Sequence, residues 1–151
     1  MTGYKAYQGN QVEGAGPLGL VLLTYDVLYK SLARARFACE SNDFAVEAEQ
    51  TGRAIEALLE LSSALNMEAG GDIAQDLARL YAYMVKRLTA DMCSGSTKAL
   101  TEVIDLVQTL REGWQQIADG ANEQSAVRHE PSPSRATMTS GISHAAMAYG
   151  L

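Results

Sequence analysis

Few side chains in this chain of 151 residues are suited to catalysis or metal binding. Its two histidines, His129 and His144, both follow the last stretch that has helical periodicity. A ferritin-like metal site needs inward-facing glutamates and Glu-x-x-His pairs on facing helices, and phosphotransfer by a helical bundle needs a histidine on a helix face. The sequence therefore predicts neither chemistry.

The remaining reactive residues do not form a catalytic pattern either. Cys39 and Cys93 are too few for a disulfide framework and lack the spacing of metal ligands, so we expect reduced, part-buried thiols. The chain has no glycine-rich phosphate loop and no nucleophile elbow. Glu56 and Glu60 are four positions apart, a spacing that is typical of the solvent-exposed face of a helix. We expect a protein that is not an enzyme and has no cofactor or bound metal.

The overall charge also limits the possible partners. The formal net charge is -6 and the isoelectric point is about 4.8. Nucleic acid and anionic membranes select proteins with a concentrated basic patch, so neither is an expected partner. No apolar run resembles a secretory signal or reaches the roughly 20 residues that a membrane span requires. We expect a cytoplasmic protein without membrane insertion.

The sequence predicts an all-α protein. Its three prolines, Pro17, Pro131 and Pro133, all lie outside residues 18–120, where apolar residues recur three and four positions apart. We expect three helices over about residues 17–38, 43–66 and 72–92. A fourth helix is expected to follow the turn at 94–96 and to end near residue 120. Such short connections favour an antiparallel up-down-up-down four-helix bundle, with both cysteines at one end.

The stretch from Ala69 to Met84 is expected to connect the second and third helices. Gly70 and Gly71 can adopt the left-handed conformation that ends a helix, and Asp72 can cap the next one. The apolar stripe that follows points to the core, whereas Tyr83 lies off it. This predicted stripe consists of Ile73, Leu77, Leu80, Tyr81 and Met84.

The first and second helices differ in their apolar faces. The second helix has one predicted core face and several small residues in its first half. In the first helix, Leu20, Leu23 and Val27 fall off the core stripe, so both sides of its first half need cover. One interpretation is that a neighbouring helix or the N-terminal segment covers the second side. The other is that this side forms a partner-binding groove. The predicted core face of the second helix contains Ala48, Thr51, Ile55, Leu58, Leu59, Ser62 and Leu65.

The two ends of the chain are expected to lie outside the bundle of residues 17–120. Residues 1–16 contain four glycines and are predicted to be too flexible for a helix, although Tyr4, Tyr7 and Val12 favour folding back onto the body. Residues 121–151 are rich in small and polar residues, and we expect a disordered tail. The weakly apolar stretch 142–151 could dock, but disorder is the favoured prediction.

Several short motifs in fixed order resemble the FliS family of flagellar export chaperones. These motifs lie between residue 4 and about residue 117. No single motif is specific for the family, but their order and spacing together are specific. A Gly16–Pro17 helix start and Val27 after the Tyr-Asp pair depart from the usual family pattern. The matching motifs are Tyr4 with Tyr7, Gln11-Val12, Tyr25-Asp26, Leu65-Asn66, Gly70-Gly71, Ile73-Ala74, Leu77, Leu80-Tyr81-x-Tyr83-Met84 and Leu110-Arg111-x-x-Trp114.

The resemblance implies a helical bundle that binds the C-terminal segment of flagellin in apolar surface grooves and prevents its premature polymerisation. It also implies delivery to the flagellar type III export apparatus through the cytoplasmic domain of the export gate. In such proteins the N-terminal segment lies in a groove when the client is absent, so residues 1–16 are expected to act as a lid. Binding of an amphipathic client would be of the helix-in-groove kind.

The expected partner-binding residues combine the off-stripe apolar positions with their neighbours. The alternative function is a structural helical homo-oligomerisation module without a client, which would bury the same surface of the first helix against a second copy. We expect a monomer or a weak homodimer. The predicted partner-binding residues are Leu20, Leu23, Tyr25, Val27, Tyr83 and Leu106, with Tyr4, Tyr7 and Val12 in the lid.

Overall fold

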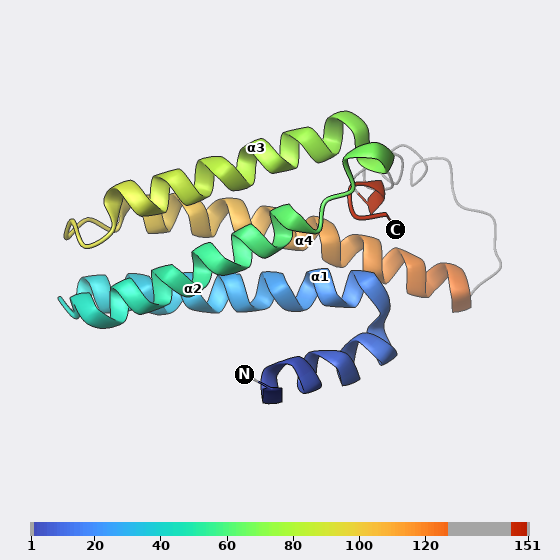
Figure 1. The fold of residues 1–151 in the computed structure, drawn as a ribbon, viewed down its shortest axis with the longest axis horizontal. Helices are drawn as coiled ribbons and strands as arrows, with labels where there is room; N and C mark the ends of the chain where they lie inside the picture. Colours follow the sequence, from blue (N-terminus) through green and yellow to red (C-terminus); the bar gives the residue numbers. More distant parts are fainter. Residues whose placement is uncertain (1, 127–145, 151) are drawn as a thin grey trace.

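Four helices joined by short turns form the body of the protein (Figure 1). The computed structural model describes residues 2–126 and 146–150, with side chains for 16–120 and 146–150. The helices are α1 (Thr2–Glu40), α2 (Phe44–Ser63), α3 (Met67–Asp91) and α4 (Lys98–Ala126). Each packs against two neighbours, in the pairs α1–α2, α2–α3, α3–α4 and α1–α4. The prediction of an all-α antiparallel bundle is therefore confirmed.

One apolar core runs the length of the bundle and receives side chains from every helix. The stripes of α1, α3 and α4 turn inward as their spacing predicts, because residues three and four apart share a helix face. In α3, Ile73 and Leu80 are half-buried at the edge of this core. The fully buried large side chains of the core include Tyr25, Leu28, Leu32, Leu58, Tyr81, Met84, Leu88, Val103 and Val107.

Helix α1 begins at Thr2, well before Pro17, so the prediction that residues 1–16 are too flexible for a helix is wrong for residues 2–15. Gly16 interrupts the helix with φ 70° and ψ −172°, a conformation that glycine adopts without steric cost. The chain turns back at this point (Figure 1). Glycines lower helix propensity without preventing helix formation, and the break falls at a single glycine.

Helix α2 is capped by Asp43 but buries a different face from the predicted one. The Asp43 side chain accepts a hydrogen bond from the Val46 backbone N–H at 3.2 Å. Leu59, expected in the core, is 54% exposed, whereas Leu61 is buried. Ala54 and Ala57 also face inward, because their small side chains allow neighbouring helices to approach closely. The predicted core face was therefore rotated away from the observed one.

Helix α3 begins at Met67, earlier than predicted, and its N-cap is Asn66 in place of Asp72. The Asn66 side chain accepts a hydrogen bond from the Ala69 backbone N–H at 2.9 Å. Gly71 has a positive φ of 51°, as expected for one of the paired glycines, but its ψ of −127° is not the left-handed helical value. Gly71 therefore interrupts α3 as Gly16 interrupts α1, so a short helical segment from Met67 precedes the main part of the helix, which begins at the predicted boundary near Asp72.

The region after Gly120 is more ordered than predicted. Helix α4 continues to Ala126, and residues 146–150 form a helical turn that packs against the bundle beside the start of α3 (Figure 1). Disorder is therefore the wrong prediction for 121–126 and 146–150. Residues 127–145, including His129 and His144, lie outside the described part of the chain.

Candidate partner-binding surface

The face of α1 opposite its core stripe carries an apolar series of residues three to ten positions apart. Leu20 and Leu23 are half-buried, Val27 is 36% exposed and Phe37 is 72% exposed. Their spacing places them along one side of the helix, with Lys30 and Arg34 between Val27 and Phe37. We call this series, Leu20, Leu23, Val27 and Phe37, the α1 face.

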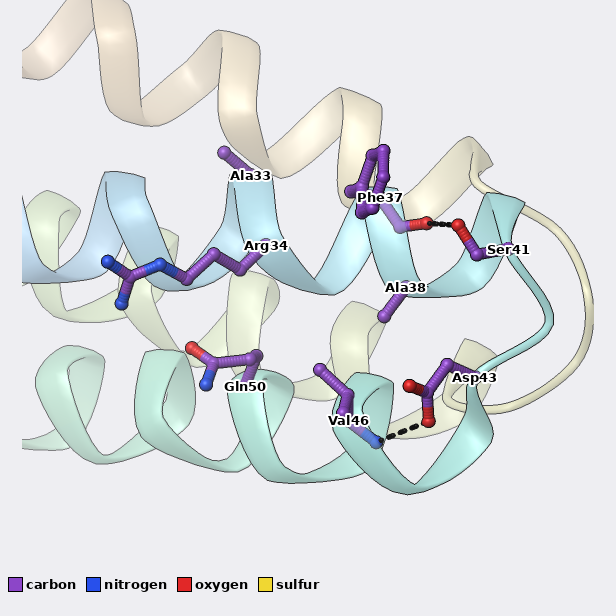
Figure 2. Close-up of a pocket in the computed structure, with 8 residues that line it drawn as sticks. All are labelled: Ala33, Arg34, Phe37, Ala38, Ser41, Asp43, Val46 and Gln50. Atoms are coloured by element: carbon purple, nitrogen blue, oxygen red, sulfur yellow. Dashed lines mark hydrogen bonds between the residues drawn. The ribbon is translucent and has the colours of Figure 1, made fainter.

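A groove between α1 and α2 continues from the α1 face, because Phe37 belongs to both. The groove has a volume of about 430 Å³. Figure 2 shows its side chains, with Phe37 and Arg34 on α1 and Val46 and Gln50 on α2. The Ser41 hydroxyl donates a hydrogen bond to the Phe37 carbonyl at 2.9 Å and closes one end. The groove is lined by Ala33, Arg34, Phe37, Ala38, Ser41, Asp43, Val46 and Gln50.

A second groove, of about 280 Å³, lies between α2 and α3. Leu59 projects into it from α2, and Tyr81, Ala82 and Val85 line it from α3. Sequence reasoning missed Phe37 and Leu59 as surface residues. Phe37 could have been found by extending the spacing of Leu20, Leu23 and Val27 along the helix, whereas Leu59 matched the core stripe equally well.

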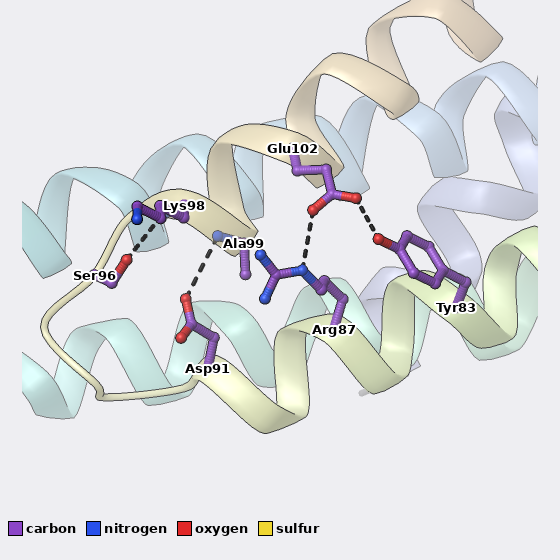
Figure 3. A network of polar contacts seen from close by, with 7 residues as sticks. All are labelled: Tyr83, Arg87, Asp91, Ser96, Lys98, Ala99 and Glu102. Carbon is purple, nitrogen blue, oxygen red and sulfur yellow. Dashed lines mark hydrogen bonds and ion pairs between the residues drawn. The ribbon is translucent and has the colours of Figure 1, made fainter.

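Tyr83 lies on the surface of α3, as its position off the stripe predicts, and is 43% exposed. Its hydroxyl donates to one carboxylate oxygen of Glu102 on α4, while Arg87 Nε donates to the other at 3.0 Å (Figure 3). The hydrogen bonds from Tyr83 and Arg87 lower the pKa of Glu102. The Tyr83 hydroxyl is therefore engaged by Glu102 at an exposed position on the surface of α3 and α4.

Two predicted partner-binding residues are less accessible than expected. Tyr25 is completely buried, and its hydroxyl lies 2.6 Å from the hydroxyl of Tyr81 across the bundle. Burial raises the pKa of Tyr25, opposed by its hydrogen bonds to Tyr81 and Trp114. Tyr25 therefore lies in the core and not in an open groove, because its neighbours fill the space around the ring. Leu106 is half-buried against the core.

The predicted lid residues Tyr4, Tyr7 and Val12 lie in the helical segment before Gly16, but their side chains are outside the described ones. Their contacts with the α1 face stay a prediction.

The motifs that carry the family resemblance meet in space although they are far apart in sequence. Arg111 Nη2 forms an ion pair with Asp26 Oδ1 at 2.5 Å, and its guanidinium lies 5.9 Å from the ring centre of Tyr29. The rings of Tyr25 and Trp114 lie 6.5 Å apart in the core beneath this pair. The Tyr-Asp and Leu-Arg-x-x-Trp motifs therefore hold α1 against α4.

Cys39 and Cys93 lie at the same end of the bundle, as predicted, and both thiols are free. Cys39 is buried and directs its thiol to the Ser96 carbonyl oxygen at 3.6 Å, whereas Cys93 is exposed. A hydrogen bond to Glu47 is the main cause that raises the pKa of Cys39, to about 11. Burial of the thiol and the negative charge of Glu47 raise the pKa in the same direction. The same carboxylate raises the pKa of Cys93.

We expect the two thiols to differ in reactivity. At neutral pH a water-soluble alkylating reagent should modify Cys93 at least about tenfold faster than Cys39, since reaction requires both access and thiolate. Mass spectrometry of Cys39→Ser and Cys93→Ser chains measures each rate separately. Equal rates in the folded protein would contradict the burial of Cys39, and unfolding in urea should equalise them.

Nothing in the described part of the chain suggests a prosthetic group. Within residues 2–126 and 146–150, no three or more histidine, cysteine, aspartate or glutamate side chains gather in a way that would hold a metal ion. Among the helices described, none has the length and apolar character needed to cross a bilayer. The prominent surface features are instead apolar grooves between helices.

The fold and its surface define a small four-helix bundle with apolar grooves between its helices. The family model "Flagellar protein FliS" matches residues 1–121. The chain belongs to the FliS family of flagellar secretion chaperones. Its members are chaperones and not enzymes, which confirms the prediction of a non-enzymatic protein.

Three curated relatives illustrate the extent of the match. The flagellar secretion chaperone FliS of Salmonella typhimurium is 33% identical over 130 residues, covering 83% of this chain and 96% of the relative. The FliS protein of Vibrio cholerae is 30% identical over 108 residues, covering 72% and 79%. The FliSB protein of Pseudomonas aeruginosa is 36% identical over 108 residues, covering 72% and 86%.

Proposed function

We propose that this chain is a cytoplasmic export chaperone that binds the C-terminal segment of flagellin along the α1 face and the α1–α2 groove. The observation that carries the proposal is the pair of exposed apolar side chains, Val27 and Phe37, on the side of α1 that the bundle does not cover, with Phe37 also lining the α1–α2 groove. An amphipathic helix presents apolar residues at matching intervals and can bury them against such a surface.

Covering the apolar side of the flagellin segment would keep it from assembling before export. The segment orders on binding, and this ordering offsets part of the free energy gained from burial, which favours release at the export apparatus. We propose that the chaperone delivers its client through the cytoplasmic domain of the export gate and acts as a monomer or weak homodimer.

The N-terminal segment is proposed to be a lid on the same surface. Leu20 and Leu23 lie directly after the break at Gly16, where the chain reverses, and are less exposed than Val27 and Phe37 further along. Tyr4, Tyr7 and Val12 would supply the covering side chains and leave when flagellin binds.

Calorimetry tests the proposal by measuring the binding of two proteins: full-length flagellin, and flagellin that lacks its C-terminal segment. We expect a one-to-one complex with the full-length protein only. Phe37→Asp should weaken it by about tenfold or more, the effect expected at a buried aromatic contact. The folded state should be little affected, because Phe37 is mostly exposed.

Two variants serve as controls. Phe37→Leu keeps an apolar side chain and should retain most of the affinity, whereas Gln116→Asp adds the same charge at an exposed position on α4. Unchanged binding by Phe37→Asp would show that the α1–α2 groove is not the client site. A salt-stable dimer that ignores flagellin would favour the homo-oligomer alternative.

A further inference from the structure

The C-terminal residues 146–150 pack into a notch at the start of α3. Ala146 and Ala148 are buried there. The Ala148 carbonyl accepts a hydrogen bond from the Asn66 backbone N–H at 2.7 Å. Because Asn66 is the N-cap of α3, its N–H has no partner within the helix. The segment thus satisfies a backbone donor that the fold leaves available.

Gly70 shapes the floor of this notch. A Cβ atom at this position would lie 2.6 Å from Ala148 Cα and 2.8 Å from Ala74 Cβ. Such distances are too short for two carbon atoms, so the close approach of Ala148 requires glycine at position 70. The notch therefore matches a chain that has a small residue at this point.

Tyr149 completes the contact with an aromatic side chain. Its hydroxyl lies 2.5 Å from the Tyr81 hydroxyl, and its ring packs edge-on against Trp114 with centroids 5.2 Å apart at 68°. Edge-to-face packing of this kind is favourable for aromatic pairs. The notch thus recognises a turn that has two small residues followed by tyrosine.

Release of the segment would leave the notch intact. The Tyr81 hydroxyl keeps its 2.6 Å contact with Tyr25, so undocking removes one of its two partners without leaving it unpaired. Asn66, Gly70, Tyr81 and Trp114 all belong to α3, α4 or the α3 cap, and are placed by the bundle itself. Tyr81 also lines the α2–α3 groove, so the notch and this groove share one residue.

We propose that this notch is a peptide-binding site whose resident ligand is the chain's own residues 146–150, and that their docking lowers the affinity for the client. This inference rests on the proposed function and extends it: the flagellin segment would continue beyond the α1–α2 groove into the α2–α3 groove, which Tyr81 lines. The segment must then leave before the client is fully engaged. The apparent affinity is therefore the intrinsic affinity multiplied by the fraction of molecules whose notch is free.

Trp114, the single tryptophan of the chain, reports docking directly through its fluorescence. In the full-length chain, Tyr149→Ala should change the Trp114 emission, whereas Met147→Ala should leave it unchanged because Met147 is exposed. A synthetic peptide with the sequence of residues 142–151, added to the Tyr149→Ala chain, should restore the original emission. The same peptide carrying Tyr149→Ala should not.

Gly70→Ala provides a second route to the same result. Its added Cβ displaces Ala148 from the notch, so this chain should show the emission of the Tyr149→Ala variant and fail to respond to the peptide. Circular dichroism checks that α3 is retained. A peptide that leaves the Trp114 emission of the Tyr149→Ala chain unchanged would overturn the binding site.

Calorimetry with flagellin tests the effect on the client. Tyr149→Ala should strengthen flagellin binding by about three- to tenfold, as expected if the notch is free for roughly 10–30% of the time. Met147→Ala should bind as the original chain does. Equal affinity of all three chains, with the peptide still bound, would overturn the inhibitory role alone. Absence of flagellin binding to every chain would overturn the proposed function, while the fluorescence result still decides whether the notch binds the segment.

Discussion

Replacing Trp114 with alanine should lower the free energy of unfolding by about 3–5 kcal/mol, the usual cost of removing a buried tryptophan. The side chain is nearly completely buried and packs against the rings of Tyr25 and Tyr149. Its loss would leave a cavity between α1, α4 and the docked C-terminal segment. Urea denaturation followed by far-ultraviolet circular dichroism measures the effect, since the variant has no tryptophan fluorescence.

A graded series separates packing from simple loss of apolar area. Trp114→Phe keeps an aromatic ring in the same space and should cost clearly less than Trp114→Ala. Exposed Gln116→Ala on the same helix should change the stability by less than about 0.5 kcal/mol. A Trp114→Ala loss below about 1 kcal/mol would mean that the helices close over the cavity, contrary to the usual limited relaxation of a close-packed core.

Much of the bundle could be predicted because the chain has regular apolar spacing and few helix breakers. In α3, Leu77, Tyr81 and Met84 turn inward while Tyr83 turns outward, as the three-four pattern requires. Such a pattern specifies a helix face wherever only one set of large apolar residues is available. It also predicted the exposed position of Val27 on α1.

The pattern fails where small residues or distant partners decide the packing. In α2, Ala54 and Ala57 turn inward and bring Leu59 to the surface, because a neighbouring helix approaches most closely over small side chains. Tyr25 was assigned to a partner-binding groove, yet it keeps the core spacing of α1, and Tyr81 on the diagonally opposite helix accommodates its hydroxyl in the core. The packing of α2 over its small residues cannot be derived from the spacing within one helix.

The docked C-terminal segment was beyond prediction for a related reason. Ala148 and Tyr149 are separated from Gly70 and Tyr81 by more than sixty residues, as the hydrogen bond between Tyr81 and Tyr149 illustrates with a separation of 68. Composition indicates that such a tail has little apolar surface to bury. It says nothing of a notch that is complementary to two alanines and a tyrosine.

The central position of Tyr81 leads to the second large effect. Tyr81→Phe removes the hydroxyl that contacts both Tyr25 and Tyr149, and should destabilise the protein by about 1–3 kcal/mol, because the completely buried Tyr25 hydroxyl loses this partner. Tyr149→Phe should cost less, since Tyr149 is only half-buried. A double-mutant cycle of Tyr25→Phe with Tyr81→Phe, measured in urea, gives the coupling between the two hydroxyls. Additive losses would show that their 2.6 Å contact contributes nothing.

The same tyrosines make stability depend on alkaline pH. Burial raises the pKa of Tyr25, Tyr81 and Tyr149 above the ordinary value of 10.0. The folded protein therefore holds these protons more tightly than the unfolded chain, so the free energy of unfolding should be unaffected by them below about pH 10 and fall as the pH rises further. Tyr81→Phe removes one of these groups, and its stability should fall less steeply between about pH 10 and 11. Parallel slopes for the two chains in urea titrations would show that Tyr81 ionises as readily in the bundle as in the unfolded chain, which its burial between Tyr25 and Tyr149 does not permit.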